Sequence, residues 1–309
     1  MIRTNKRHLV EKAVSGTISH PRLIFRNPWL IDPSGRPHVM PGVGGITYNV
    51  TVGDSALDFV GDHIEPGVSV TIPGDDPQKN RLAGLNILSC VGNVAVVASG
   101  KAAGSRGVVT GKHGGVEHVI VDFPRSTLDK LDIGDRIRIR AFGQGLRLRD
   151  FEDVHVMNLD PRLLARMKLA TREGQLVVPV THVIPASLMG SGLGSKHSYS
   201  GDYDIQTGDM ENIKKHGLQN LRIGDIIAIA DADCRFGRTI GSGATTIGVV
   251  VHGSCVTSGH GPGVTVLMTT GRKLVVPRIE EEANLSSYLG IGGYGRSRRS
   301  GGAKRRRKS

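Results

Sequence analysis

The chain has 309 residues and a formal net charge of +12 at pH 7. A chain of this length buries about 75% of its unfolded surface, which is enough for one large or two ordinary domains without covalent crosslinks. Its three cysteines, Cys90, Cys234 and Cys255, form no CxxC pair. A disulfide framework and a zinc knuckle are therefore excluded, and a reducing compartment is favoured.

The positive charge is concentrated at the C-terminus. Eight basic residues lie between Arg296 and Ser309, which leaves a charge of +4 for the rest of the chain. The body is thus only mildly basic, which disfavours extensive phosphate contacts over its surface. We predict that 291–309 is a disordered basic tail. It either makes weak contacts with nucleic acid or serves as a solubilising end.

The N-terminal sequence MIRTNKRHLVEKAVSG is polar and charged where a secretory signal has an apolar centre. No apolar run approaches the roughly 18 residues of a membrane-spanning helix. These features predict a cytoplasmic protein with no membrane contact.

Short runs rich in β-branched residues, separated by Gly, Asp and Asn, dominate the chain. Several are apolar on successive residues, which indicates strands covered on both faces, as in a barrel or sandwich. We therefore predict a mainly β fold of barrel-like or sandwich-like units with a few short helices. The expected strands are 45–52, 94–98, 107–110, 119–123, 136–142, 175–180, 226–230, 246–251 and 264–269.

Three segments carry helix signals. Asp160 followed by Pro161 is typical of a helix N-terminus, and the expected helix continues through LLARMKLA, residues 163–170. A second helix is expected over 210–216, ending before a left-handed Gly217. A third is expected over 280–289.

The nonapeptides 131–139 and 221–229 share the pattern LxIGDxIxI. Each Gly-Asp pair predicts a turn, and the alternating isoleucines predict a strand with one face turned inward. The pattern reflects either two related β units or a chance recurrence of turn and strand. Taking the helix start at Asp160 as the boundary, we predict an N-terminal β domain over 1–159 and a C-terminal β domain over 160–290 that carries the candidate site.

The segment 97–121 resembles the strand pair of KOW-type, SH3-like barrels, with a Gly after a strand, a basic glycine-rich loop and a second strand. That resemblance implies RNA contact, whereas a plain glycine-rich hairpin fits the same residues. A phosphate-binding P-loop is disfavoured, because GVVTGKH at 107–113 has neither the required glycine spacing nor a hydroxyl residue after the lysine.

Over most of residues 40–290, strings such as IADADCRFGR and SGHGPGV resemble an uncharacterised prokaryotic family known as a domain of unknown function. That resemblance implies a β-rich, oligomeric protein. A more distant resemblance is to the acetamidase/formamidase family of metal-dependent amide hydrolases. It is carried by GDYD at 201–204, ADAD at 230–233 after a strand, and GSG at 241–243 before the next strand.

Hydrolysis of an amide needs an activated water and a stabilised oxyanion, and a metal ion supplies both. The candidate metal ligands are Asp202, Asp231 and His252, and the candidate catalytic residues are Asp204, Asp233 and His260. Carboxylate oxygens suit Mg²⁺ or Mn²⁺, and histidine adds Zn²⁺. The alternative is that the aspartates cap turns and the histidines are interior or loop residues.

Four further residues are candidate substrate-binding groups. Arg235 and Arg238 are positioned to clamp a carboxylate or phosphate, or else to pair with nearby aspartates. Lys112 and His113 either complete a site, including that of a neighbouring subunit, or form a solvated hairpin tip. Cys234 is expected to be a small buried cysteine and not a nucleophile.

These observations predict a homo-oligomeric, metal-dependent hydrolase acting on a small-molecule substrate with an amide or related C–N bond. The alternative is a non-enzymatic binding protein that contacts nucleic acid through the KOW-like hairpin and the basic tail.

Overall fold

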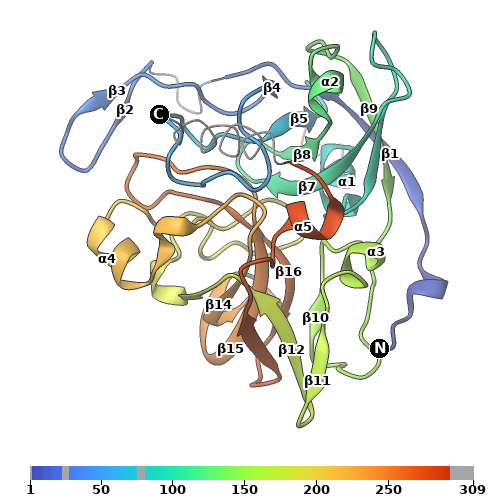
Figure 1. The fold of residues 1–309 in the computed structure, drawn as a ribbon, viewed down its shortest axis with the longest axis vertical. Coiled ribbons are helices and arrows are strands. Elements are labelled where there is room, and N and C mark those ends of the chain that lie inside the picture. The colour runs from blue at the N-terminus through green and yellow to red at the C-terminus, as the bar shows by residue number, and fades with distance from the viewer. Residues whose placement is uncertain (1, 23–27, 75–80, 293–309) are drawn as a thin grey trace, which may run out of the picture.

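The computed structural model describes residues 2–22, 28–74 and 81–292, and in these residues the chain is mainly β (Figure 1). A barrel and a five-stranded sheet account for most of the strands. The predicted fold class is therefore confirmed. The predicted basic tail lies outside the described residues from position 293 onward.

A closed six-stranded barrel forms the N-terminal part of the fold (Figure 1, upper right). Its strands follow in the order β1 (Lys12–Ile18), β9 (Arg136–Ala141), β6 (Val94–Val97), β7 (Arg106–His113), β8 (His118–Asp122) and β5 (Gly67–Thr71). Antiparallel pairing of β5 with β1 closes the ring, and β4 (Ile46–Thr47) adds to β5. In β9 the isoleucines are buried and the arginines exposed, as period-2 alternation requires.

A second, five-stranded sheet occupies the lower centre of Figure 1. Its order is β10 (His155–Val156), β16 (Val264–Thr270), β15 (Thr239–Val250), β14 (Ile226–Asp233) and β13 (His182–Pro185). The first half of β14 is buried on both faces, which explains its unbroken apolar sequence. Smaller units are the sheet of β11 (Ala170–Arg172), β12 (Gln175–Val180) and β17 (Val275–Ile279) and the hairpin of β2 (Leu30–Ile31) and β3 (Pro37–His38).

Eight of the nine predicted strands are present, 175–180 with the predicted ends and seven with at least one end shifted, and the ninth, 45–52, is paired only at Ile46–Thr47. The chain leaves the sheet there because the carboxylate of Asp54 accepts hydrogen bonds from the backbone N–H and the hydroxyl of Thr51, which forms a turn. Local side-chain bonding therefore overrides the β-rich composition of this segment.

The repeated Gly-Asp pairs form the same kind of turn. Gly134 and Gly224 both have left-handed φ angles, 89° and 87°. The aspartate after each accepts a hydrogen bond from the backbone N–H three residues earlier, at 3.0 Å for Asp135 and 2.8 Å for Asp225. The predicted turn-then-strand is confirmed at both places, in β9 and in β14.

The predicted helix after Asp160 begins as expected but is short. Asp160 caps α3 (Pro161–Leu164) by accepting from the Arg162 N–H. The continuation to residue 170 is wrong, because Lys168 takes a left-handed φ of 53° and β11 starts at Ala170.

The other helices follow their capping signals. α4 (Met210–Lys215) ends near Gly217, which has a φ of 67°, as predicted. The predicted helix over 280–289 is confirmed only in its second half, because Asn284 caps α5 (Leu285–Leu289). Two further α-helices in the described residues were not predicted: α1 (Arg81–Leu88) and α2 (Arg125–Leu128). No helix in the described part of the chain is both long and apolar enough to cross a membrane.

Barrel strand β7 packs directly against β16 of the five-stranded sheet. The Lys112 backbone N–H donates to the Thr265 hydroxyl, which in turn donates to the Lys112 carbonyl, both at 3.1 Å. Gly111 allows this approach, since a Cβ there would lie 2.2 Å from a methyl carbon of Val251. The end of β7 is therefore fixed against the strands that carry the C-terminal histidines.

The buried carboxyl of Asp122, at the end of β8, gives a prediction about stability. Burial raises its pKa from 3.8 to about 7. The folded state therefore binds this proton more tightly than the unfolded state, so stability is lost as pH rises from about 4 to about 7. At about pH 8 we expect Asp122→Asn to be more stable than the wild type by up to about 4 kcal/mol.

Urea unfolding of both proteins at about pH 8 and about pH 4 measures this difference, which should vanish at the lower pH. Equal stability at the higher pH would show that the folded state does not disfavour ionisation of Asp122.

Candidate metal centre

Buried imidazoles and carboxylates gather where the barrel meets the five-stranded sheet. Four segments that are distant in sequence contribute: the loop before β5, the β7–β8 hairpin, the loop before α4 and the β15–β16 connection. We call this set the buried cluster. Its members are Asp62, His63, Glu65, His113, His118, Asp202, Asp204, His252 and His260.

The loop before β5 is fixed from both sides. The Asp62 N–H donates to the Pro41 carbonyl at 2.8 Å, and the His63 N–H donates to the Ser254 carbonyl at 3.1 Å. His63 has a φ of 54°, which is uncommon for a residue other than glycine. Such strained backbone gathers at functional sites, where the surrounding structure maintains it.

Three of the imidazoles that offer ligand atoms are oriented in the same way. In each, an oxygen lies within hydrogen-bonding distance of Nδ1, and with the hydrogen on Nδ1 the neutral ring has its lone pair on Nε2. Metal-binding histidines have this kind of support in their outer shell. The bonds run from His63 to Asp62 (2.5 Å), from His113 to Glu65 (2.7 Å) and from His252 to the Gly253 carbonyl (2.8 Å).

One group of three ligand atoms forms a nearly equilateral triangle. The Nδ1 of His260 lies 3.2 Å from the Nε2 of His63 and 3.1 Å from the Oδ2 of Asp204, and the last two atoms are 3.5 Å apart. With bonds of about 2.05 Å, tetrahedral zinc places neighbouring ligand atoms about 3.3 Å apart. The three atoms therefore match one face of a tetrahedral coordination shell.

A second group lies beside the first. It consists of His113, Asp202 and His252, whose ligand atoms all lie within 4.8 Å of one another. The Oδ2 of Asp202 is 2.6 Å from the Nε2 of His252, while its Oδ1 accepts from the Gly114 N–H at 2.9 Å. A Cβ at Gly263 would lie 1.9 Å from that Oδ2, so this position has no room for a side chain.

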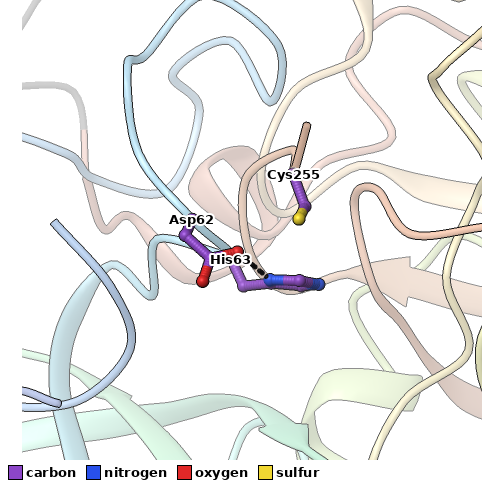
Figure 2. Close-up of side chains that lie close together, drawn as sticks. All are labelled: Asp62, His63 and Cys255. Carbon is purple, nitrogen blue, oxygen red and sulfur yellow. Dashed lines mark hydrogen bonds and ion pairs between the residues drawn. The ribbon is translucent and has the colours of Figure 1, made fainter. Parts of the chain in front are cut away.

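A third group shares His63 with the first and includes a thiol. Figure 2 shows Asp62 joined to the His63 ring and Cys255 directing its sulfur toward that ring. Because Asp62 takes the His63 Nδ1 hydrogen, the ring offers only its Nε2 as a ligand, and that atom faces the first group. Cys255 is thus a neighbour of the centre.

The electrostatics of the buried cluster are those of a cation site. Burial raises the pKa of Asp204, but hydrogen bonds from His260 and His63 outweigh it and lower that pKa below its ordinary value. Burial lowers the pKa of His63, and the Asp204 and Asp62 carboxylates overcome this and raise it to about 12. A positive charge at this place is therefore strongly favoured.

The structure brings together five of the residues that the sequence singled out: Asp202, Asp204, His252, His260 and His113. His113 belongs to the same chain's cluster and is not at a solvated tip, because the end of β7 packs on β16.

Lys112, predicted to bind substrate, is fully buried. Its ammonium donates to the Asn158 side chain and the Tyr199 carbonyl, each at 2.7 Å. Burial lowers its pKa to about 8. Lys112 is therefore placed to brace the junction of the barrel and the sheet.

The strand-end acids Asp231 and Asp233 are not brought to the buried cluster. A one-residue irregularity in β14 falls between Ala230 and Ala232, and Asp231 there has a φ of 58°. Its exposed carboxylate accepts from the Gly243 N–H. Asp233 instead forms a bidentate pair with Arg235, whose Nε donates to Oδ1 and whose Nη2 donates to Oδ2. The alternation expected of a regular strand fails because the bulge breaks it.

Arg235 and Arg238, predicted to bind substrate, form their contacts outside the buried cluster. Arg235 is engaged by Asp233 at 2.7 Å. Arg238 is buried and donates to the backbone carbonyls of Gly192 and Ser200, which belong to the loop that carries Asp202. Arg238 therefore supports this loop from behind.

Sequence reasoning missed Asp62, His63 and Glu65 as site residues. Glu65 accepts hydrogen bonds from the Nδ1 atoms of both His113 and His118. A usable signal was the string GDHIEPG at 61–67, in which glycines flank two acids and a histidine. Its partners lie far away in sequence, so spacing alone could not reveal them.

The fold and the buried cluster define a β-barrel protein with a histidine–carboxylate centre where two sheets meet. The chain belongs to the DUF4438 family: the profile of its N-terminal domain of unknown function matches residues 29–165, and that of its C-terminal domain matches residues 166–289. The predicted resemblance to an uncharacterised family is thereby confirmed.

Among solved structures, the chain is similar to the crystal structure of TM1086, with 47% sequence identity and a TM-score of 0.88. The similarity covers 93% of this chain and 99% of that one. A comparison with curated proteins gave no match. These comparisons do not show the resemblance to the acetamidase/formamidase family.

Proposed function

We propose that the protein is a metal-dependent hydrolase that acts on a small amide or a related C–N bond. The observation that carries the proposal is the triangle of His63, Asp204 and His260 ligand atoms, with edges of 3.1 to 3.5 Å. Three protein ligands with a further position left for water or substrate are typical of catalytic zinc sites.

These three residues would hold the ion, and the imidazoles favour Zn²⁺ or Mn²⁺ over Mg²⁺. When bound, a divalent ion lowers the pKa of water to about 7 and polarises a carbonyl. Asp62 keeps the Nε2 of His63 free for coordination by accepting the Nδ1 hydrogen at 2.5 Å.

The attacking water must also lose a proton. The Nε2 of His252 lies 3.9 Å from the Oδ1 of Asp204, so the His252–Asp202 pair adjoins the three ligands. We assign Asp202 as the proton acceptor in a centre with one ion.

Substrate would approach from the side of His260. Its side chain retains 30% of its exposure, against 3% for His63 and 7% for Asp204. Such an approach suits a small molecule. Two expectations from the sequence remain predictions: that the protein forms a homo-oligomer, and the alternative that it is a binding protein that contacts nucleic acid.

Metal analysis tests whether the ion is held by the buried cluster or by the strand-end acids Asp231 and Asp233. After dialysis against Zn²⁺ or Mn²⁺ and desalting, we expect the wild type, Asp231→Ala and Asp233→Ala to retain the ion equally, because neither aspartate belongs to the buried cluster. The wild type should also release ammonia from formamide or acetamide, and a chelator should stop the release. A wild type without bound ion, or loss of ion in either variant, would overturn the assignment.

A further inference from the structure

We propose that the buried cluster holds two adjacent divalent ions bridged by the carboxylate of Asp204. This inference rests on the proposed metal-dependent function and deepens it. One ion would lie in the group of His63, Asp204 and His260, and the other in the group of His113, Asp202 and His252.

The two oxygens of Asp204 face different groups. Its Oδ2 lies 3.1 Å from the Nδ1 of His260 and 3.5 Å from the Nε2 of His63. Its Oδ1 lies 3.9 Å from the Nε2 of His252, which belongs to the other group. A carboxylate with one oxygen toward each of two ligand sets has the orientation of a bridging ligand.

In each group, an imidazole nitrogen faces a carboxylate oxygen, which is an arrangement that can bind a cation. With Nδ1 hydrogens donated to Asp62 and to the Gly253 carbonyl, the Nε2 atoms of His63 and His252 carry lone pairs in their neutral forms. Each of these lone pairs faces a carboxylate oxygen, that of Asp204 or of Asp202. Two facing acceptors need a proton or a metal ion between them, and an ion in the second group would take the place of the proton that His252 and Asp202 share at 2.6 Å.

The number of buried carboxylates is compatible with two ions when the imidazoles are neutral. The buried cluster contains four carboxylates that are at most 7% exposed, and two divalent cations would neutralise them. They are Asp62, Glu65, Asp202 and Asp204. Arg238, behind Asp202, adds one positive charge, which is committed to backbone carbonyls.

The ring positions place the groups close enough for a two-ion site. The His63 ring centroid is 5.1 Å from that of His252 and 5.6 Å from that of His113. Paired catalytic ions lie about 3.5–4 Å apart. In this arrangement Asp202 would be a ligand, and the two ions would lower the pKa of the bound water so that its proton leaves to solvent.

The test measures the number of ions per chain. Wild-type protein saturated with Mn²⁺ or Zn²⁺ and desalted should contain two ions. His260→Gln and His113→Gln should each contain about one, while the exposed-site control His8→Gln should contain two. Diffraction at the absorption edge of the metal should show two anomalous peaks about 3.5–4 Å apart in the wild type, a readout that does not depend on how well the variants fold.

One ion per wild-type chain at saturation, or a single anomalous peak, would overturn the two-ion inference and leave the proposed function standing if ammonia release persists. A wild type without any bound ion would overturn both.

Discussion

Asp204→Asn is expected to lose its bound metal and to reduce chelator-sensitive hydrolysis by more than about 100-fold. Changes in the outer shell of a metal site already cost about 10–100-fold in affinity or activity. Asp204 is the carboxylate that both histidines of the first group contact, at 3.1 Å for His260 and 3.5 Å for His63. An asparagine retains one acceptor oxygen but neither the negative charge nor the second carboxylate oxygen.

Isothermal titration with Zn²⁺ or Mn²⁺ and ammonia release check this expectation together. Asp58→Asn is the matched control, because it makes the same chemical change at an exposed position. If Asp204→Asn binds the metal and turns over substrate as well as the wild type does, Asp204 is not a metal ligand.

Glu65→Gln is expected to destabilise the metal-free protein by about 3–5 kcal/mol, the range for removal of one partner from a buried ion pair. Glu65 is fully enclosed and accepts hydrogen bonds from His113, His118, the Gly44 N–H and the Ser69 hydroxyl. Burial raises its pKa, and the two imidazoles outweigh this effect and hold the pKa well below its ordinary value. The amide keeps the volume but turns an NH₂ group toward these donors.

The same substitution should weaken metal binding by about 10–100-fold, since it releases the Nδ1 of His113. Urea unfolding in the presence of chelator gives the stability change, and competition with a chromophoric chelator gives the affinity. Glu11→Gln provides the comparison, because its ion pair with Arg140 lies at the surface and is worth at most about 1 kcal/mol. Equal losses in the two variants would contradict the role of Glu65.

The sequence determined the features that depend on neighbouring residues. The runs of β-branched residues predicted four of the six barrel strands and three of the five strands of the second sheet, and Asp160 before Pro161 predicted the start of α3. The two Gly-Asp turns also formed as predicted, because a left-handed glycine and an aspartate that accepts a backbone N–H act within four residues. Local hydrogen bonding and strand periodicity depend on residues that are close together in the sequence, so the sequence alone predicts them.

The sequence also named part of the centre, because Asp202, Asp204, His252 and His260 are chemically competent residues in glycine-rich loops. It erred at Asp231 and Asp233, since even spacing predicts a shared side only in a regular strand and the register of β14 shifts at Asp231, between Ala230 and Ala232.

Only the tertiary structure decided which residues meet. His63 and His260 are 197 positions apart, yet their ring nitrogens lie 3.2 Å from each other. This convergence depends on closure of the barrel and on the packing of β7 against β16, where Gly111 leaves room for Val251. Contacts between such distant segments are fixed by how whole sheets pack, and no local pattern in the sequence records them.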